Sequence, residues 1–297
     1  MGSTYGIWNN GTGSVNIIGG SVNKCIYNGS TGAVTVSGGT VVGDTCGIQN
    51  DGTGTVSVSG GSVSGETGID NPNGGRVVVS TGSVSGEYTG IYNGNTGSTV
   101  TVSGGSVSGK ECGIDNYNAT ATVSGGNVTG SSGYGIKNES NGTFKLSGVP
   151  TITGTTADIY LNNAIITIGD GGLTYTSDKA ISVKMSTPGT FTSGWTEKMG
   201  ENADYDSYFT SADSTYTVQP DGSGELKLAE PPAHSHDMSV ECGGSGVTFE
   251  PWDGTTTFPG GNVYLTDDVT LNETLTISSG TVNLCLNGHN ITKTELN

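Results

Sequence analysis

An isoleucine followed two positions later by an asparagine recurs seven times in the first 140 residues, at intervals of 19 to 23 residues. The pairs are Ile7/Asn9, Ile26/Asn28, Ile48/Asn50, Ile69/Asn71, Ile91/Asn93, Ile114/Asn116 and Ile136/Asn138. Most are followed by a near-copy of one Val-x-Val-Ser-Gly-Gly phrase, as at 55–65 and 99–109. Self-similarity at this period indicates stacked supersecondary units, none of which can bury its apolar face alone.

A single repeat, residues 47–65, shows how the chain should run. Its apolar residues are Ile48, Val56, Val58 and Val63, and they alternate with small polar residues. Alternation of period two is typical of strands, with the apolar side chains pointing inward. Glycines and asparagines between the strands supply turns, because glycine readily adopts positive φ. The sequence therefore predicts an all-β parallel β-helix, with three short strands in each coil of about 22 residues.

The same geometry gives the repeated asparagines a structural role. Coils of parallel strands stack about 4.8 Å apart, so equivalent residues lie directly over one another. Asparagine tolerates turn conformations, and stacked side-chain amides can hydrogen-bond along a column. We expect a structural ladder made of Asn9, Asn28, Asn50, Asn71, Asn93, Asn116 and Asn138.

The Ile-x-Asn and Val-x-Val-Ser-Gly-Gly motifs make the chain resemble the right-handed parallel β-helix proteins of the pectin-lyase-like class. It is also similar to repetitive secreted or wall-attached proteins of Gram-positive gut bacteria that are described as adhesins. The resemblance covers about residues 5–185 and again residues 260–292. It implies a right-handed solenoid and a secreted or cell-surface location. The class includes lyases, hydrolases and non-enzymatic stalks, so the resemblance does not determine the function.

The repeat weakens along the sequence, and its course predicts four regions in the chain. The β-helix repeats occupy residues 1–185, and an aromatic-rich C-terminal cap region is expected over 186–229, since terminal units of a solenoid must close its core. Residues 230–236 contain a proline pair, which is typical of a stiff hinge between domains. Alternating strands over 237–297 predict the start of a second tandem β-helix-like unit. The chain starts almost inside its first repeat, so we interpret it as an excised piece of a longer protein.

Composition and charge exclude several classes of partner. The net charge is −17, and Arg76 is the only arginine. A chain without a basic face cannot hold phosphates, so we expect no nucleic-acid partner. No run of about 18 apolar residues is present, so membrane insertion is not expected. We also expect no cofactor.

Candidate ligand-binding residues lie on the outward column between each isoleucine and asparagine. This position carries Trp8, Tyr27, Gln49, Asp70, Tyr92, Asp115, Lys137 and Tyr160. Aromatic rings mixed with carboxylates are what a sugar chain needs, namely apolar faces and hydroxyl acceptors. Exposed strands also tolerate tyrosine without any function. Two interpretations of this column therefore remain: an inert strand surface, or a glycan-binding site. The glycan-binding site would use Trp8, Tyr27, Asp70, Tyr92, Asp115 and Tyr160.

Catalysis is not expected from this column. Asp70 and Asp115 lie two coils apart, about 10 Å at the strand spacing. Glycoside hydrolysis requires paired carboxylates about 5 to 9.5 Å apart. The resemblance implies that a polysaccharide lyase would also need an acidic calcium cluster and a basic residue, and Arg76 is the only arginine. We therefore assign no catalytic residues and no metal site.

The five cysteines form no regular disulfide framework. Cys46 and Cys112 are three coils apart, about 14 Å, and cannot pair. Cys25 could reach Cys46 if the shorter first repeat shifts the register, but we expect Cys25, Cys46 and Cys112 to be partly buried thiols.

The C-terminal region contains a second group of sulfur and imidazole side chains. Its members are His234, His236, Cys242, Cys285 and His289. These residue types suit zinc, although their spacing matches no known finger. Three alternatives remain for these residues: a disulfide between Cys242 and Cys285, a zinc site, or no special role.

These inferences give two functional hypotheses. The first is a non-enzymatic bacterial surface or secreted protein that serves as a rigid β-helical adhesin or spacer. The alternative is a carbohydrate-binding or polysaccharide-processing β-helix that uses the outward Tyr/Asp column. The expected partners are a polysaccharide, a host glycan or a host protein.

Overall fold

The structure is a computed structural model. It describes residues 5–174, 180–231, 234–236, 247–254, 261–272, 274–277, 280–287 and 289–293. The chain divides into two compact units, Met1–Glu230 and Pro231–Asn297. The first unit carries the candidate site and is described first.

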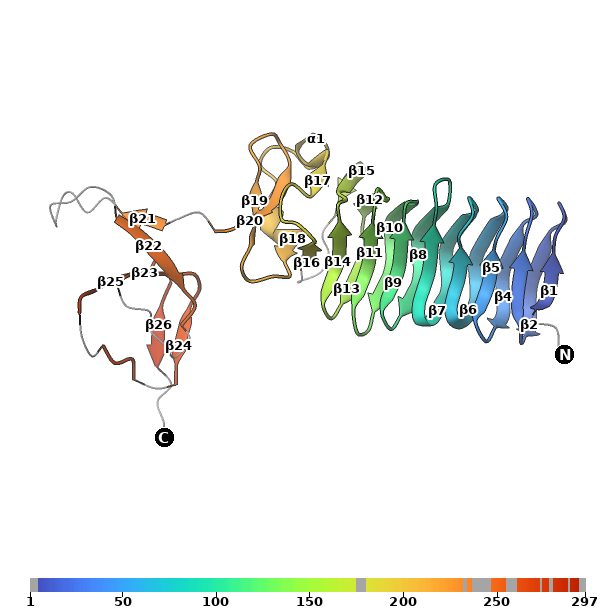
Figure 1. Cartoon of the computed structure of the whole chain (residues 1–297), viewed down its shortest axis with the longest axis horizontal. Coiled ribbons are helices and arrows are strands. Elements are labelled where there is room, and N and C mark those ends of the chain that lie inside the picture. Colours follow the sequence, from blue (N-terminus) through green and yellow to red (C-terminus); the bar gives the residue numbers. More distant parts are fainter. Residues whose placement is uncertain are drawn as a thin grey trace. The chain divides into compact units, whose positions relative to one another are not determined.

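The first unit is a parallel β-solenoid, as the repeat predicts, and Figure 1 shows its coils as successive rungs. Its first fifteen strands are β1 (Tyr5–Asn9), β2 (Val15–Val22), β3 (Cys25–Asn28), β4 (Val34–Val42), β5 (Cys46–Asn50), β6 (Thr55–Asn71), β7 (Arg76–Gly94), β8 (Thr99–Gly109), β9 (Cys112–Tyr117), β10 (Thr120–Gly130), β11 (Tyr134–Glu139), β12 (Thr143–Gly148), β13 (Thr151–Gly154), β14 (Ala157–Asn162) and β15 (Ile166–Leu173).

The register between coils follows the sequence repeat. In β6 and β7, Ile69 pairs with Ile91 and Asn71 with Asn93, and the same parallel pairing continues from coil to coil. The stack extends past the last clear repeat, because Ile136 pairs with Ile159 and Ile159 with Val183. Equivalent side chains therefore lie in columns along the solenoid.

Stacked β-branched residues fill the interior. Ile26, Ile48, Ile69, Ile91 and Ile114 are all 0% exposed. Columns made mostly of valine, from the other strands of the coils, complete one continuous apolar cluster. Each buried side chain of this size contributes about 1.5–3 kcal/mol through removal of apolar surface from water, so the stack itself stabilises the fold.

The asparagine ladder is present as predicted. The Nδ2 atom of each asparagine donates to the Oδ1 atom of the next, with N–O distances of 2.6–2.9 Å from Asn9 to Asn138. The same Nδ2 atoms also donate to turn carbonyls, as Asn71 does to Gly75 O at 3.0 Å. Asn28 through Asn138 in this column are 0% exposed. Burial of an amide is costly unless it is hydrogen-bonded, and the ladder satisfies these groups along the stack.

Glycines at one corner permit close stacking. Gly105 has φ +72°, and a Cβ atom there would lie 2.7 Å from the carbonyl oxygen of Gly82 in the preceding coil. Gly82 has φ +75° and meets Gly60 in the same way. Only glycine provides both this backbone conformation and this clearance, which explains the repeated Gly-Gly pair.

Beyond β15 the coils become irregular. The remaining elements of the first unit are β16 (Ile181–Met185), β17 (Thr192–Ser193), α1 (Trp195–Met199), the 3₁₀ turn η1 (Tyr205–Ser207), β18 (Phe209–Ser211), β19 (Thr217–Pro220) and β20 (Leu226–Ala229). Strands β17 and β18 still pair in parallel with β15 and β16. The hairpin β19–β20 is antiparallel, and the rings of Phe191, Trp195 and Phe209 pack together beside it. The parallel stacking thus continues into residues 186–229 before the chain direction reverses.

The second unit has its own small core of Trp252, Val263, Leu265 and Val269. Its strands are β21 (His234–His236), β22 (Val247–Trp252), β23 (Gly261–Leu265), β24 (Val269–Leu271), β25 (Val282–Cys285) and β26 (Ile291–Lys293). Val263 pairs in parallel with Leu284, and Val269 with Ile291. The paired residues are 21 and 22 positions apart in the sequence, which matches the repeat length of the first unit.

Candidate functional site: the outward column

The outward column exists as the sequence predicts. Each of its residues pairs with its equivalent in the next coil, so the column is continuous from β1 to β14. In order its members are Trp8, Tyr27, Gln49, Asp70, Tyr92, Asp115, Lys137 and Tyr160. Trp8 is 59% exposed, and the others are partly buried.

Aromatic rings gather at the first coils. Trp8 and Tyr27 are stacked, with centroids 4.2 Å apart, and Tyr5 contacts both rings at 5.1 Å. The Tyr27 hydroxyl donates to Asp51 Oδ2 at 2.9 Å. Because the rings of Trp8 and Tyr27 cover each other's faces, Trp8 is the most exposed ring of this group of three. A sugar would meet Tyr27 mainly at its edge and hydroxyl.

The centre of the column is acidic. Asp70, Tyr92 and Asp115 occupy consecutive coils. Burial, and then the nearby Asp51 carboxylate, raises the pKa of Asp70. The pKa of Asp115 rises to about 6, chiefly because of burial. Within the described part of the chain, the Asp115 Oδ1 atom is buried and has no hydrogen-bond partner, which explains why its ionised form is disfavoured.

Lys137, the cationic residue of the column, forms an ion pair with a residue of its own strand. Lys137 Nζ lies 2.9 Å from Glu139 Oε1, in the same strand, rather than pairing with Asp115. Burial lowers the pKa of Lys137, but the hydrogen bond to Glu139 and the charge of Asp115 raise it overall. Beyond Lys137 the rings of Tyr134 and Tyr160 are stacked at 4.9 Å. Tyr160 therefore lies in a second aromatic group, separated from the acidic centre by an ion pair.

The register between coils sets the distance between the two carboxylates of the column, and therefore the reactions that they could catalyse. Tyr92 lies between Asp70 and Asp115, so two coil spacings, about 10 Å, separate the two acids. Carboxylates at that distance are at or beyond the limit for a glycosidase pair. Among the described residues no group of three or more His, Cys, Asp or Glu side chains could hold a metal ion. The arrangement can accept hydrogen bonds from a ligand and offer ring surface to it.

The cysteine prediction was wrong at two positions. Cys25 and Cys46 form a disulfide, with their Cα atoms 5.6 Å apart, and only Cys112 of the three is a buried free thiol. The physical reason is the shorter first repeat: Cys25 directly precedes Ile26, whereas Gly47 separates Cys46 from Ile48. Adjacent coils already lie within disulfide range, and this difference in local path brings the two sulfurs together.

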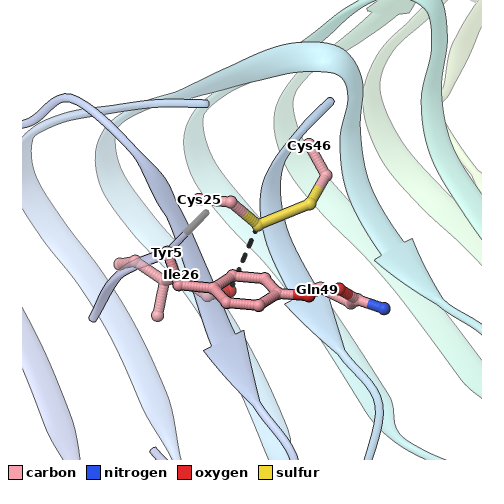
Figure 2. Close-up of a disulfide and its surroundings, with 5 residues drawn as sticks. All are labelled: Tyr5, Cys25, Ile26, Cys46 and Gln49. Carbon is pink, nitrogen blue, oxygen red and sulfur yellow. Dashed lines mark hydrogen bonds between the residues drawn. A yellow bond between two sulfur atoms is a disulfide. The ribbon is translucent and has the colours of Figure 1, made fainter. Parts of the chain in front are cut away.

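The ring of Tyr5 lies near this disulfide. Figure 2 shows the Tyr5 ring alongside the two sulfurs, with its hydroxyl directed to Gln49. The Tyr5 hydroxyl donates to Gln49 Oε1 at 2.8 Å, from the first coil to the third. Cys25 is 2% exposed and Cys46 is 7% exposed. The disulfide is therefore almost inaccessible to solvent.

The cysteine and histidine group of the C-terminal region is described only in part. Cys242 and the side chains of His234 and His236 lie outside the described residues. Cys285 is a free thiol, and His289 Nδ1 lies 3.7 Å from Asp268. The described part of the chain contains no helix with the length and apolarity needed to cross a bilayer.

The Ile-x-Asn pattern alone did not identify several residues that contact the column. Asp51 and Glu139 follow ladder asparagines directly, and Tyr5 and Tyr134 occupy the position of Cys46 and Cys112 in their coils. A comparison of the positions that flank each Ile-x-Asn motif could have found them. The column is therefore one row of a wider polar and aromatic face.

Comparison of the chain with known families, curated proteins and solved structures finds no match.

Proposed function

We propose that the protein is a non-enzymatic, secreted or cell-surface rod that acts as an adhesin or spacer. The observation that supports this most is the uninterrupted asparagine ladder, which links coil to coil without a break from Asn9 to Asn138. Stacked coils of this kind give a stiff, extended face on which a long ligand can lie. Such a role requires rigidity and reach rather than a catalytic centre.

The disulfide supports the proposed location. Disulfides form and persist in oxidising environments such as the cell exterior. The bond between Cys25 and Cys46 joins two coils that are already paired by backbone hydrogen bonds, so it adds a covalent link to the solenoid. We also propose, from the resemblance of the repeat, a right-handed winding and a kinship with pectin-lyase-like and adhesin-like surface proteins.

A second candidate is carbohydrate binding along the outward column. The specific observation in its favour is the continuous register that joins Trp8 to Tyr160, with carboxylates between two groups of aromatic rings. One column residue per coil, at about 4.8 Å, is a spacing close to the length of a sugar ring. Hydroxyls of a neutral polysaccharide would donate to Asp70 and Asp115, and Trp8 would provide the apolar face.

A glycan and mucin binding screen tests these two candidates. The wild-type chain is compared with a Tyr27→Ala/Tyr92→Ala variant that melts at the same temperature, with exposed Tyr88→Ala as the matched control. Binding that the double variant loses and the control retains would support the column as a glycan site. Binding to protein ligands but to no glycan would support the adhesin. The absence of binding to both glycans and protein ligands would favour the spacer.

A further inference from the structure

The end of the first unit contains a recess that the column does not include. It has a volume of about 340 Å³ and lies where the solenoid strand β18 gives way to the antiparallel strand β19. Its lining includes Asp206, Phe209, Thr210, Asp213, Ser214, Tyr216 and Val218. This volume is at the small end of the range for ligand sites in proteins, about 300–1,000 Å³, and suits a ligand of one ring.

The lining combines an apolar base with a polar rim. Phe209 is 1% exposed and Val218 is 6% exposed, and both belong to the core. Tyr216 is half-buried against the same core, while Asp206, Thr210 and Ser214 are exposed. Ligand sites for small molecules typically have this composition, in which apolar contacts supply affinity and a few polar groups fix the orientation.

Charge narrows the class of ligand. The two ionisable acids of the recess are Asp206 and Asp213, and none of its lining residues is basic. Asp213 is held in place by the Thr215 N–H at 3.0 Å and by contacts between its backbone and Ser211 Oγ. The hydrogen bonds from Thr215 lower the pKa of Asp213, so this carboxylate carries a negative charge at neutral pH. An anionic ligand would be repelled, whereas hydroxyl groups would find acceptors.

We propose that this recess binds one uncharged pyranose ring, with the ring lying against Tyr216 and its hydroxyl groups donating to Asp206 and Asp213. Thr210 and Ser214, whose hydroxyls both donate and accept, complete the rim. The site is independent of the outward column and of the proposed rod function.

Calorimetric titration of the full chain with paired sugars tests the proposal. The probes are glucose with glucuronate and galactose with galacturonate, because each pair differs only by a carboxylate. We expect saturable binding of at least one neutral sugar with a millimolar Kd, and binding at least about tenfold weaker for its uronate. Lack of saturation by both neutral sugars in the millimolar range, or equal binding of a uronate, would overturn the proposal.

Variants connect such binding to the recess. Asp206→Asn should weaken binding about tenfold, the effect of losing one hydrogen bond to a charged group. Asp204→Asn, which removes a neighbouring acid outside the lining, is the matched control and should stay near wild type. Ser214→Trp fills the recess from an exposed position and should abolish binding with an unchanged melting temperature. Tyr88→Ala, at an exposed position outside both the recess and the outward column, should bind as wild type does. Equal binding by the Ser214→Trp variant would refute the assignment.

Discussion

Tyr5 and Gln49 are hydrogen-bonded across two coils, and the Cys25–Cys46 disulfide lies beside the ring that connects them. The first coil is thereby fixed to the third by a tyrosine, and the second to the third by a covalent bond. In this first coil Ile7 and Val15 are only partly buried, whereas the isoleucines of the Ile-x-Asn motifs from Ile26 to Ile136 are 0% exposed.

Removal of the Tyr5 ring should expose the disulfide to reductants. Thiol–disulfide exchange requires access of a thiolate to a sulfur atom, and both sulfurs now lie in nearly buried residues. We expect Tyr5→Ala to speed reduction by dithiothreitol, as measured by mass shift after alkylation. Tyr5→Phe should retain slow reduction because the ring remains, and Tyr88→Ala should not change the rate. Equal rates for all four proteins would show that the ring does not shield the bond.

Loss of the disulfide should lower stability. The bond closes a loop with a sequence separation of 21 residues. Chain-entropy arguments give about 3 kcal/mol for a loop of this size. We expect the Cys25→Ser/Cys46→Ser variant to lose about that much free energy of unfolding, as measured by denaturant titration under oxidising conditions. Cys112→Ser serves as the control for the substitution chemistry. A double variant as stable as the wild type would mean that the bond adds nothing to the stacked coils.

Interruption of the asparagine ladder should be costly. Asn71→Leu removes the acceptor of Asn50 Nδ2 and the donor to both Asn93 Oδ1 and Gly75 O. Each buried group left unpaired costs about 1–3 kcal/mol, so the free energy of unfolding should fall by at least about 3 kcal/mol. Asn73→Ala is the control, because it loses one exposed hydrogen bond to Asp51. If both variants melt at the same temperature, the ladder is not a stabilising element.

The ladder was predictable because it depends only on repetition. Equivalent residues of stacked coils must lie over one another, so the intervals between Ile-x-Asn motifs were enough to predict the columns and the register. The disulfide was not predictable in this way, because it depends on one missing glycine before Ile26. The stacking of Trp8 on Tyr27, and the pairing of Lys137 with Glu139 instead of Asp115, depend on side-chain rotamers that no repeat specifies.

Asp115 should make stability depend on pH. Its pKa is about 6 in the folded protein and 3.8 in the reference state, so the folded state binds more protons between these values. Stability contributed by this group is present below pH 4 and is lost as the pH rises to about 6, by up to about 3 kcal/mol. We expect Asp115→Asn to raise the melting temperature at pH 7.5 and to raise it much less at pH 4. Asp44→Asn, at an exposed position, is the control. An Asp115→Asn effect that does not change with pH would contradict this explanation.

Hydrogen exchange followed by mass spectrometry tests the rod most directly. A rigid solenoid held by a continuous ladder should show slow backbone exchange in every coil from Ile26 to Ile136, with no weakly protected coil between them. In Asn71→Leu, faster exchange should spread to the coils on both sides of residue 71, because each coil is stabilised by its neighbours. Fast exchange of any inner coil in the wild-type protein would contradict the account, since a spacer or adhesin with such a break could not act as one stiff face.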